Sequence, residues 1–241
     1  MAELTLGSFN LHMGRGAGGH DAPFYDVVPA CKEIGTDVLV LQEAWVPDGE
    51  DGDVMAVAAA LGYGVAATFA VARAECHDQV RLIARAGGAG DGDWQVAVLS
   101  RLPVVDSRIL ALEPQLPRDP GRRALLAVTL EVDGRSFTVC GTHLPLLKNP
   151  VWRLAPSLRR ALPPGARPAA LAGDMNMWGW CVDRLAGPGW RRAVRGRTYP
   201  ARRPHSQTDH ILVSQPVEVV DAHVVRQVMS DHRPIRARLR F

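Results

Sequence analysis

A carboxylate and an amide stand two residues apart, at Asp174 and Asn176, after an uncharged run of small apolar residues. Residues 168–172 begin with Pro and are followed by Gly, which indicates a buried strand that ends at Gly173. Side chains two apart on an extended segment share a face, so a potential base or metal ligand and an amide would point at one spot. The alternative is an Asx turn, in which both side chains only hydrogen-bond the local backbone.

Polar side chains of similar kinds recur at the ends of other predicted strands. They are Asn10, Glu43, His143, Asp209, Asp231 and His232. Each is ordinary when taken alone, since an Asp beside a His on a surface is usually only solvated. Their joint recurrence favours a functional site, because sites in α/β proteins are commonly built at strand ends.

Patterned apolar segments would position these residues. Strands are predicted over residues 4–10, 37–41, 96–99, 123–132, 135–144, 168–172, 211–213 and 235–241. The dipeptide Asp133-Gly134 favours a type I′ hairpin turn between the fourth and fifth of these strands.

Helical spacing of apolar residues covers 24–34 and 54–61, and residues 150–162 are also expected to be helical. Pro29 lies inside the first helix, which implies a late start or a kink. Asp53 is the expected N-cap of the second helix. Two further stretches give no clear secondary-structure prediction: residues 64–93 are poorly patterned, and 187–207 form an Arg-rich, loop-like segment.

Length and composition favour one globular domain. The chain has 241 residues, 47% of them hydrophobic, so we expect a single domain over residues 1–241. The net charge of +3 is carried almost wholly by arginine, since Lys32 and Lys148 are the only lysines. Either a GC-rich genome or phosphate binding explains this enrichment.

The cysteines and the N-terminus favour a reduced, cytoplasmic protein, which we expect to be a monomer. The four cysteines are scattered and form no close-spaced pair of the kind that zinc sites use. The N-terminus has no basic and apolar leader, and no stretch approaches the 18 apolar residues of a transmembrane helix. Secretion would require a leader that this sequence lacks.

Short motifs around the candidate residues occur in a fixed order along most of the chain. They are Ser8-Phe9-Asn10, Leu41-Gln42-Glu43, Leu99-Ser100-Arg101-Leu102-Pro103, Thr142-His143-Leu144, Gly173-Asp174-Met175-Asn176, Thr208-Asp209-His210-Ile211 and Ser230-Asp231-His232-Arg233-Pro234. In this order they resemble the endonuclease/exonuclease/phosphatase superfamily, which includes pancreatic-deoxyribonuclease-like enzymes, abasic-site endonucleases, inositol-phosphate phosphatases and neutral sphingomyelinases. Each motif alone is weak evidence, whereas the ordered set is specific.

The resemblance implies an α/β fold, a four-layer sandwich of two mixed β-sheets packed face to face and flanked by helices. It also implies that Glu43 holds a divalent cation, Mg²⁺ with Mn²⁺ as a substitute, with support from Asn10 and with Asp231 nearby. Some abasic-site endonucleases have a second acidic metal ligand two residues after the first Asn. His12 stands there in this chain.

The resemblance further assigns catalytic roles. Asp174 would position and deprotonate the attacking water, and Asn176 would orient that water or bind a phosphate oxygen. His143 and His232 would flank the scissile phosphate and donate hydrogen bonds to the charge that develops there. Asp209 would pair with His232 and keep it protonated.

Substrate-binding residues are less defined by the sequence. The candidates are Arg101, Arg123, Trp178, Arg197 and Arg203. The arginines between residues 191 and 203, with Trp190 and Tyr199 among them, form either a phosphate-tracking patch for nucleic acid or a solvated loop. Trp178 is either a wall for a base or an acyl chain or a loop anchor, and structural pairing competes with phosphate binding at Arg101 and Arg123.

Three functions remain open at this point. The first is a Mg²⁺-dependent phosphodiesterase or nuclease, whose partner would be nucleic acid or a similar diester. The second is a phosphatase or phosphodiesterase for a small phosphorylated metabolite or a lipid headgroup. The third is a catalytically silent binding module, against which the intact set of catalytic-type residues argues.

Overall fold

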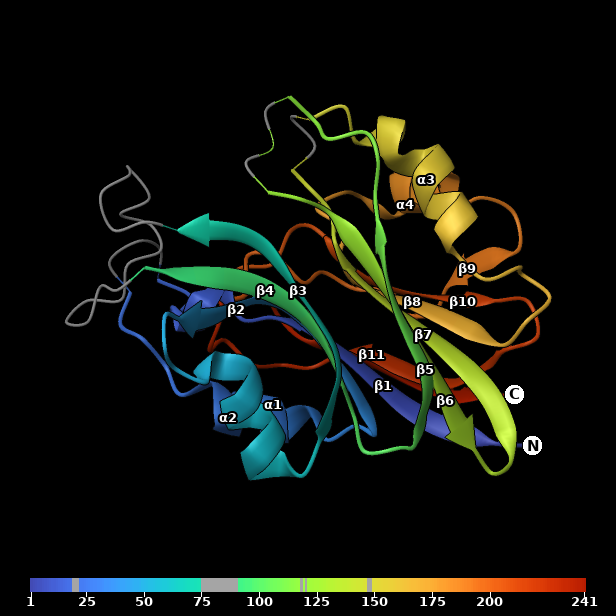
Figure 1. Ribbon diagram of the computed structural model, residues 1–241, viewed down its shortest axis with the longest axis horizontal. Coiled ribbons are helices and arrows are strands. Elements are labelled where there is room, and N and C mark those ends of the chain that lie inside the picture. The colour runs from blue at the N-terminus through green and yellow to red at the C-terminus, as the bar shows by residue number, and fades with distance from the viewer. Residues whose placement is uncertain (19–21, 75–90, 118, 120, 147–148) are drawn as a thin grey trace.

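Two β-sheets pack face to face in the computed structural model of the chain (Figure 1). The structure describes residues 1–18, 22–74, 91–117, 119, 121–146 and 149–241. Both sheets are mixed: in each, one pair of neighbouring strands is parallel and the others are antiparallel.

The first sheet has six strands in the order β11-β12-β1-β2-β4-β3. Their bounds are β1 Glu3–Asn10, β2 Val38–Pro47, β3 Gly64–Ala74, β4 Gly92–Ser100, β11 Glu218–Val224 and β12 Ile235–Arg240. Strands β1 and β2 are the parallel pair, so Asn10 and Gln42 end up side by side in the register.

The second sheet has six strands in the order β5-β6-β7-β8-β10-β9. Their bounds are β5 Val104–Ala111, β6 Ala124–Val132, β7 Arg135–His143, β8 Ala169–Asp174, β9 Trp190–Arg192 and β10 Asp209–Ser214. Strands β7 and β8 are parallel, and their register pairs His143 with Asp174. Asp209 at the start of β10 also lies opposite Asp174.

Helices complete four layers. On the outer face of the first sheet lie α1 (Val27–Ile34) and α2 (Gly52–Leu61), and on that of the second lie α3 (Ala155–Ala161) and α4 (Gly179–Ala186). Short 3₁₀ turns occur at His12–Gly14 (η1) and Val151–Leu154 (η2). The structure therefore confirms the predicted four-layer α/β sandwich.

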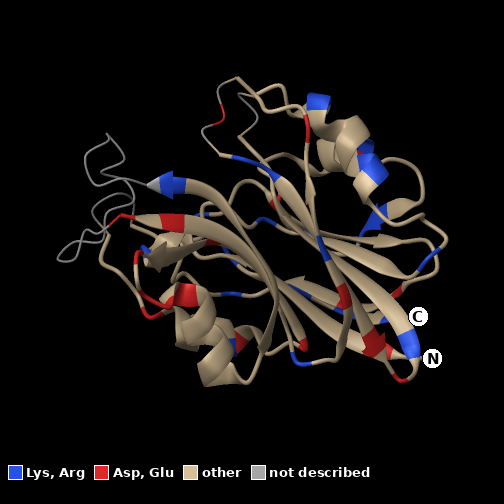
Figure 2. Cartoon of the chain, in the orientation of Figure 1, with Lys and Arg blue, Asp and Glu red and all other residues tan. Residues whose placement is uncertain are grey.

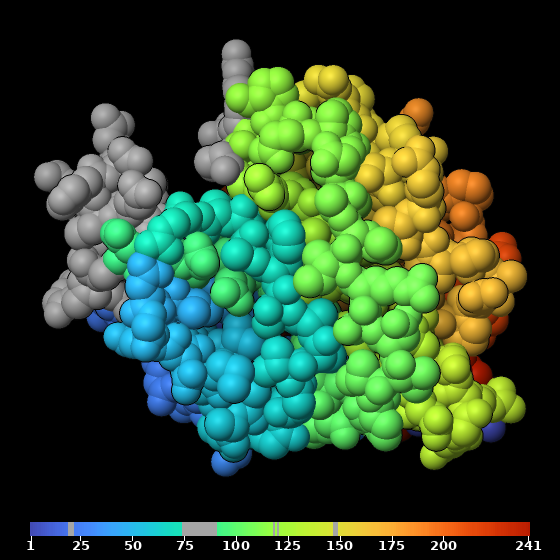
Figure 3. All heavy atoms as spheres, viewed as in Figure 1, coloured from blue at the N-terminus to red at the C-terminus, as the bar shows by residue number. Residues whose placement is uncertain are grey.

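The alternation of apolar side chains explains why the sheets stack this way. In β2, Val38 and Val40 point into the core between the sheets, whereas Leu39 and Leu41 point out under the helices. All four are fully buried, as expected for a strand covered on both faces. At the edge of the sandwich β3 contacts β5, and their surfaces meet along the face shown in Figure 3.

Several sequence predictions about the elements are confirmed. The hairpin turn has positive φ at both Asp133 (49°) and Gly134 (71°), as a type I′ turn requires. Pro29 marks a late helix start: α1 begins at Val27, where the Asp26 carboxylate accepts a hydrogen bond from Val28 N at 2.9 Å.

Other predictions need correction. Asp53 is not the N-cap of α2, which is Asp51, because the Asp53 carboxylate instead accepts a hydrogen bond from Trp45 N at 2.9 Å. The poorly patterned region after residue 64 begins with β3, while residues 75–90 lie outside the described part of the chain. The loop-like segment 187–207 contains β9.

Residues of both charge signs are distributed over the molecule. Acidic and basic residues are interspersed along the elements coloured in Figure 2. None of the described helices combines the length and hydrophobicity needed to cross a bilayer. Cys31 and Cys140 are buried free thiols, as expected of small apolar side chains, and Cys76 lies outside the described residues.

Candidate active site

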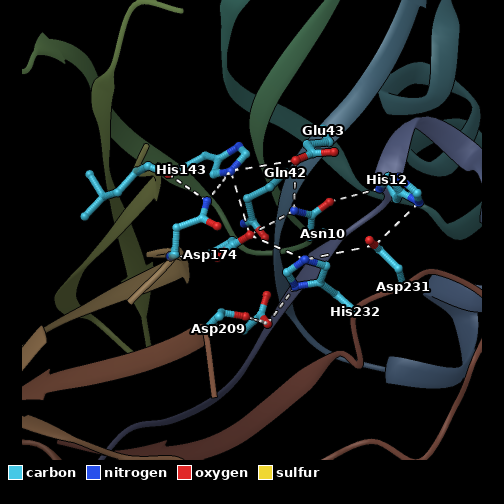
Figure 4. A network of polar contacts seen from close by, with 12 residues as sticks. Asn10, His12, Gln42, Glu43, His143, Asp174, Asp209, Asp231 and His232 are labelled. Atoms are coloured by element: carbon cyan, nitrogen blue, oxygen red, sulfur yellow. Dashed lines mark hydrogen bonds and ion pairs between the residues drawn. The ribbon is translucent and has the colours of Figure 1, made fainter. Parts of the chain in front are cut away.

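Both sheets deliver polar side chains to one end of the sandwich. Asn10 ends β1, His143 ends β7 and Asp174 ends β8. Asp209 begins β10, and His232 lies in the turn before β12. Figure 4 shows that these side chains point toward one another. The strand-end residues predicted from the sequence are therefore brought together.

Asn10 joins the two sheets through its side-chain amide. Its Nδ2 donates to Asp174 Oδ2 at 3.0 Å and lies 3.3 Å from Glu43 Oε1. Its Oδ1 accepts from His12 N at 2.9 Å, which fixes which end of the amide faces the carboxylates. Asn10 thus orients two acidic groups from different sheets toward a common space.

Glu43 reaches this space because β2 is irregular there. The pairing of β2 with β4 shifts register between Leu41 and Ala44, and Glu43 itself has a positive φ of 50°. A bulge of this kind re-aims a side chain, and non-glycine residues with such φ values cluster at functional sites. The strand then continues to Pro47, beyond the apolar run that predicted it.

The two oxygens of Asp174 serve different purposes. Oδ1 accepts from Asn176 N at 2.8 Å, which is the Asx turn considered as an alternative above. Oδ2 is held by Asn10 and lies 3.7 Å from Nε2 of both His143 and His232. The local turn therefore positions the carboxylate and leaves one oxygen facing the cluster.

Gly173 makes this arrangement possible. Its φ is +152°, and a Cβ at this position would lie 1.9 Å from Thr142 O of the neighbouring strand. Asn176 follows with φ of 51°, a value that Asn tolerates better than most residues. The Asn176 amide then donates to Leu144 O at 2.9 Å and to His143 Nε2 at 3.1 Å.

His232 and Asp209 form the expected pair. His232 Nδ1 lies 2.9 Å from Asp209 Oδ2, which also accepts from the Thr208 hydroxyl at 3.0 Å. Burial alone would lower the pKa of His232, but Asp209, Asp174 and Asp231 together outweigh it and raise this pKa well above its usual value. Burial likewise opposes ionisation of Asp209, yet His232 dominates and lowers the pKa of Asp209. The pair therefore exists as imidazolium and carboxylate.

His143 is held in the opposite state. Burial, with repulsion from Arg123 and His232, lowers the pKa of His143 well below its usual value. Its Nε2 accepts the hydrogen bond from Asn176, so the neutral ring carries its proton on Nδ1. Trp94 packs edge-on against the ring at a centroid distance of 5.6 Å. The two histidines thus differ in charge.

Burial and neighbouring carboxylates both disfavour the ionised forms of Asp174 and Glu43. Burial raises the pKa of Asp174 to about 7, with Asp209 adding to the effect and His232 opposing it. Burial and repulsion from Asp231 raise the pKa of Glu43. Positive charge placed between these groups would relieve the repulsion.

Residues 7–232 match the Endonuclease/Exonuclease/phosphatase family. The chain belongs to the endonuclease/exonuclease/phosphatase family. Members of this family hydrolyse phosphate esters. No curated protein matches the chain by sequence.

Solved structures share the fold of this family member. An endonuclease/exonuclease/phosphatase from Beutenbergia cavernae has a TM-score of 0.71 at 23% identity, covering 100% of this chain and 72% of the other. Sphingomyelinase C from Streptomyces griseocarneus has a TM-score of 0.67 at 19% identity, covering 98% and 99%. The human Nocturnin catalytic domain with bound sulfate has a TM-score of 0.69 at 19% identity, covering 99% and 94%. At these identities the likeness concerns the fold alone.

The donor set fits the divalent cation that such family members use. Glu43 and Asp231 repel each other, the Asn10 amide nitrogen supports Glu43, and hard carboxylate oxygens of this kind suit Mg²⁺. His12 Nδ1 lies 3.5 Å from Asp231 Oδ1 and forms no hydrogen bond with a described residue.

A second group of ligand-type atoms is less suited to a cation. Atoms of Asp174, Asp209 and His232 lie within 4.8 Å of one another. However, His232 and Asp209 already hydrogen-bond each other, and the positive charge on His232 would repel a cation. Glu43 and Asp231 remain the better candidates.

The predicted substrate-binding arginines lie in different places. Arg101 donates to Thr36 O at 3.2 Å and stacks on Tyr63 at 4.2 Å, beside the start of β2, whereas Glu43 lies further along that strand at the bulge. Arg123 forms a buried ion pair with Asp119 and donates to His143 O at 3.2 Å. Structural pairing therefore accounts for both guanidinium groups, and Arg123 also positions a candidate catalytic residue.

The remaining candidates are exposed. Trp178 is 53% exposed and directly precedes α4, and Arg197 and Arg203 lie on the surface of the segment before β10. Tyr199 packs on His232 with ring centroids 4.8 Å apart. The sequence shows Tyr199 only as an aromatic residue in the Arg-rich stretch and does not single out Trp94, since nothing in the local pattern links either ring to a particular histidine.

Proposed function

We propose that the chain is a divalent-metal-dependent phosphodiesterase, a nuclease that hydrolyses phosphodiester bonds by in-line attack of water. One observation carries the proposal. A single oxygen, Asp174 Oδ2, is fixed by Asn10 and faces a cationic and a neutral histidine at equal distances of 3.7 Å. A base and a cationic hydrogen-bond donor side by side are what phosphoester hydrolysis by water requires.

Asp174 acts as the base in this proposal. Its pKa of about 7 lets it exist as carboxylate near neutral pH and still accept a proton from water. Because Oδ1 is engaged by Asn176 N, the water would be held by Oδ2. Asn176 keeps the carboxylate in this orientation.

His232 supplies the proton and the positive charge. Asp209 holds Nδ1, so Nε2–H points toward Asp174 and the space where the phosphate would lie. Hydrogen bonds from an imidazolium to phosphate oxygens strengthen as negative charge develops on them. His143 could donate a hydrogen bond to the phosphate from Nε2 only after that nitrogen gains a proton, because at rest it accepts the hydrogen bond from Asn176.

Glu43 and Asp231 would hold the divalent cation, with Asn10 orienting Glu43. When bound, Mg²⁺ or Mn²⁺ supplies charge neutralisation at the phosphate and the leaving oxygen. The raised pKa of Glu43 supports this assignment, since the carboxyl is partly buried near another acid with too little positive charge around it.

Nucleic acid is the substrate class we favour. Tyr199 is 36% exposed while its ring rests on His232, so its free face can stack on a base next to the reacting phosphate. Exposed arginines of the same segment provide charge for a phosphate backbone.

A lipid headgroup is the second candidate, favoured by a separate observation. Trp178 and Trp180 are 53% and 63% exposed and follow Asn176 within four residues. Exposed tryptophans near a site suit contact with a membrane surface, where one end of the ring is apolar and the other is hydrated.

The test is Mg²⁺-dependent hydrolysis across one substrate panel. The panel contains plasmid and single-stranded DNA, RNA, a simple phosphodiester, a phosphomonoester and sphingomyelin. Asp174→Asn is the inactive control, and Asp106→Asn, on the exposed strand β5, is a matched carboxylate control. Cleavage of polymers that only Asp174→Asn abolishes supports the nuclease. Turnover confined to sphingomyelin or a monoester favours the second candidate, and silence on all substrates refutes both.

A further inference from the structure

An open hollow of about 350 Å³ lies beside the Asp209–His232 pair and shares no residue with it. Its lining comes from the segment before β10, from the end of β11 and from Arg233. Arg233 N donates to Thr198 O at 2.9 Å, and the Thr198 hydroxyl accepts from Asp209 N at 3.3 Å. Two lining residues therefore adjoin this network: Arg233 follows His232 in the chain, and Arg197 precedes Thr198.

The strand registers place the hollow at the active-site end of the sandwich. Val224 ends β11 opposite Ile235, which is three residues after His232. β9 runs antiparallel to β10, so the chain leaves Arg192 toward the end where Asp209 lies. Both walls of the hollow therefore reach the end of the molecule at which the catalytic candidates gather.

Four arginines line the hollow without an acidic neighbour. They are Arg195, Arg197, Arg226 and Arg233. Among the described residues, the first three form no hydrogen bond or ion pair with their side chains, and the fourth is anchored to Ala201 O at 2.7 Å. No described Asp or Glu belongs to the lining, and Asp221 reaches it only through a contact of 3.2 Å with His223.

A solvated Arg-rich loop does not account for this arrangement well. The four arginines come from three separate segments, and like charges that converge without counter-ions repel one another. Such a concave basic surface concentrates positive potential and attracts anions. The other lining groups include Pro204, Ala222 and Val224 but no aromatic ring. The hollow therefore suits a phosphate group rather than a base.

We propose that this hollow is a second phosphate site, which binds the backbone of a nucleic-acid strand beside the phosphate that is cleaved. The inference rests on the proposed function and deepens it, since it selects polymers over small esters. One guanidinium group can donate two parallel hydrogen bonds to two oxygens of the same phosphate, which makes arginine an effective phosphate-binding residue.

The test measures binding without metal, so that hydrolysis plays no part. A labelled single-stranded DNA of about 12 nucleotides is titrated in EDTA and followed by fluorescence anisotropy over a range of salt concentrations. The variant Arg195→Gln/Arg226→Gln is compared with Arg135→Gln/Arg160→Gln. The latter removes the same charge from exposed positions at the start of β7 and on α3. Thermal denaturation confirms that both variants are folded.

The expected result is a loss of DNA affinity only in the variant that changes the hollow. Arg195→Gln/Arg226→Gln should weaken binding by roughly 10-fold or more and reduce the slope of log K against log salt by about 1, because fewer phosphates are neutralised. The control pair should bind as the parent does. Equal loss in both variants, or no loss in either, would overturn the proposal.

The same experiment separates this inference from the proposed function. If Asp174→Ala binds DNA in EDTA as the parent does and the hollow variant does not, the second site stands even if no ester is hydrolysed. If DNA is cleaved by the parent but the hollow variant binds normally, the nuclease stands and the second site is refuted.

Discussion

Replacing Asp174 by Asn should abolish hydrolysis and at the same time stabilise the metal-free protein at alkaline pH. Burial raises the pKa of Asp174 from 3.8 to about 7, so ionising this group is harder in the folded than in the unfolded chain. The contribution of Asp174 to the free energy of unfolding is therefore fully present below pH 3.8 and is lost as the pH rises toward about 7. An amide in the same place removes that loss.

The size of the effect follows from the pKa difference. A change from 3.8 to about 7 corresponds to about 4 kcal/mol, at 1.36 kcal/mol per pH unit. This is an upper limit, because the carboxylate accepts from Asn10 Nδ2 and Asn176 N, and an amide reproduces these bonds only in part. A net gain of roughly 1–3 kcal/mol in the free energy of unfolding is expected near pH 8.5.

Urea denaturation in EDTA measures this gain. Parent and variant are compared at about pH 5 and about pH 8.5, with Asp106→Asn as an exposed carboxylate control. Hydrolysis of a simple phosphodiester with Mg²⁺ is measured on the same preparations, and a loss of about 10²–10⁴-fold is expected for Asp174→Asn.

Two results would refute this reasoning. If Asp174→Asn is no more stable than the parent at about pH 8.5, or if its advantage does not grow between the two pH values, the pKa of Asp174 is not raised by burial. If it is stabilised but retains full activity, Asp174 is not the base.

Three further predictions concern the neighbours of Asp174. Asp209→Asn removes the carboxylate that raises the pKa of His232, so the alkaline limb of the kcat/KM profile should move to lower pH as the imidazolium is lost earlier. Glu43→Gln should weaken Mg²⁺ binding by at least about 10-fold in calorimetric titration, and EDTA should abolish hydrolysis by the parent. Gly173→Ala should lower the free energy of unfolding by on the order of 3 kcal/mol or more in urea denaturation, because its Cβ would lie 1.9 Å from Thr142 O.

Each of these has a clear contrary outcome. An unchanged alkaline limb in Asp209→Asn would mean that another group sets it. Equal Mg²⁺ affinity in Glu43→Gln would remove Glu43 from the metal site. Parent-like stability of Gly173→Ala would show that the backbone at the end of β8 relaxes easily.

The sequence predicted best the residues that directly follow an apolar run. Asn10 and Asp174 end strands whose hydrophobic patterns stop at those positions, so both the strand and the place of the polar group could be read together. Asp209 opens β10 for the same reason. Parallel pairing sets His143 beside Asp174, and antiparallel pairing sets Asp209 opposite Asp174. The stacking of the two sheets then brings Asn10 to the same end of the sandwich.

Features set by tertiary contacts could not be read from local patterns. Glu43 reaches the site through a bulge inside β2, although the apolar run suggested that the strand stopped two residues earlier. Alanine-rich β3 carries little pattern because its neighbours, rather than its propensity, hold it in the sheet. Arg101 stands in a motif shared with the family, yet its distance from Glu43 depends on the antiparallel pairing of β4 with β2.

Helix boundaries were uncertain for a similar reason. Trp178 precedes α4 without any side-chain cap, so no start signal marks that helix. Asp53 has a residue type and position that suit an N-cap of α2, but its carboxylate accepts a hydrogen bond from Trp45 N instead. For α2, a contact with another element decides what a short-range rule leaves open.

The amide of Asn10 has a consequence for the relation between activity and folding. It bonds to Asp174 across 164 positions of the chain and from one sheet to the other. The two halves of the protein each carry an incomplete set of reacting groups, and only their correct docking brings base, imidazolium and metal ligands into register. Catalytic activity should therefore depend sensitively on how the two sheets pack against each other. On heating or in dilute denaturant, it should decline before either sheet loses its own hydrogen bonds.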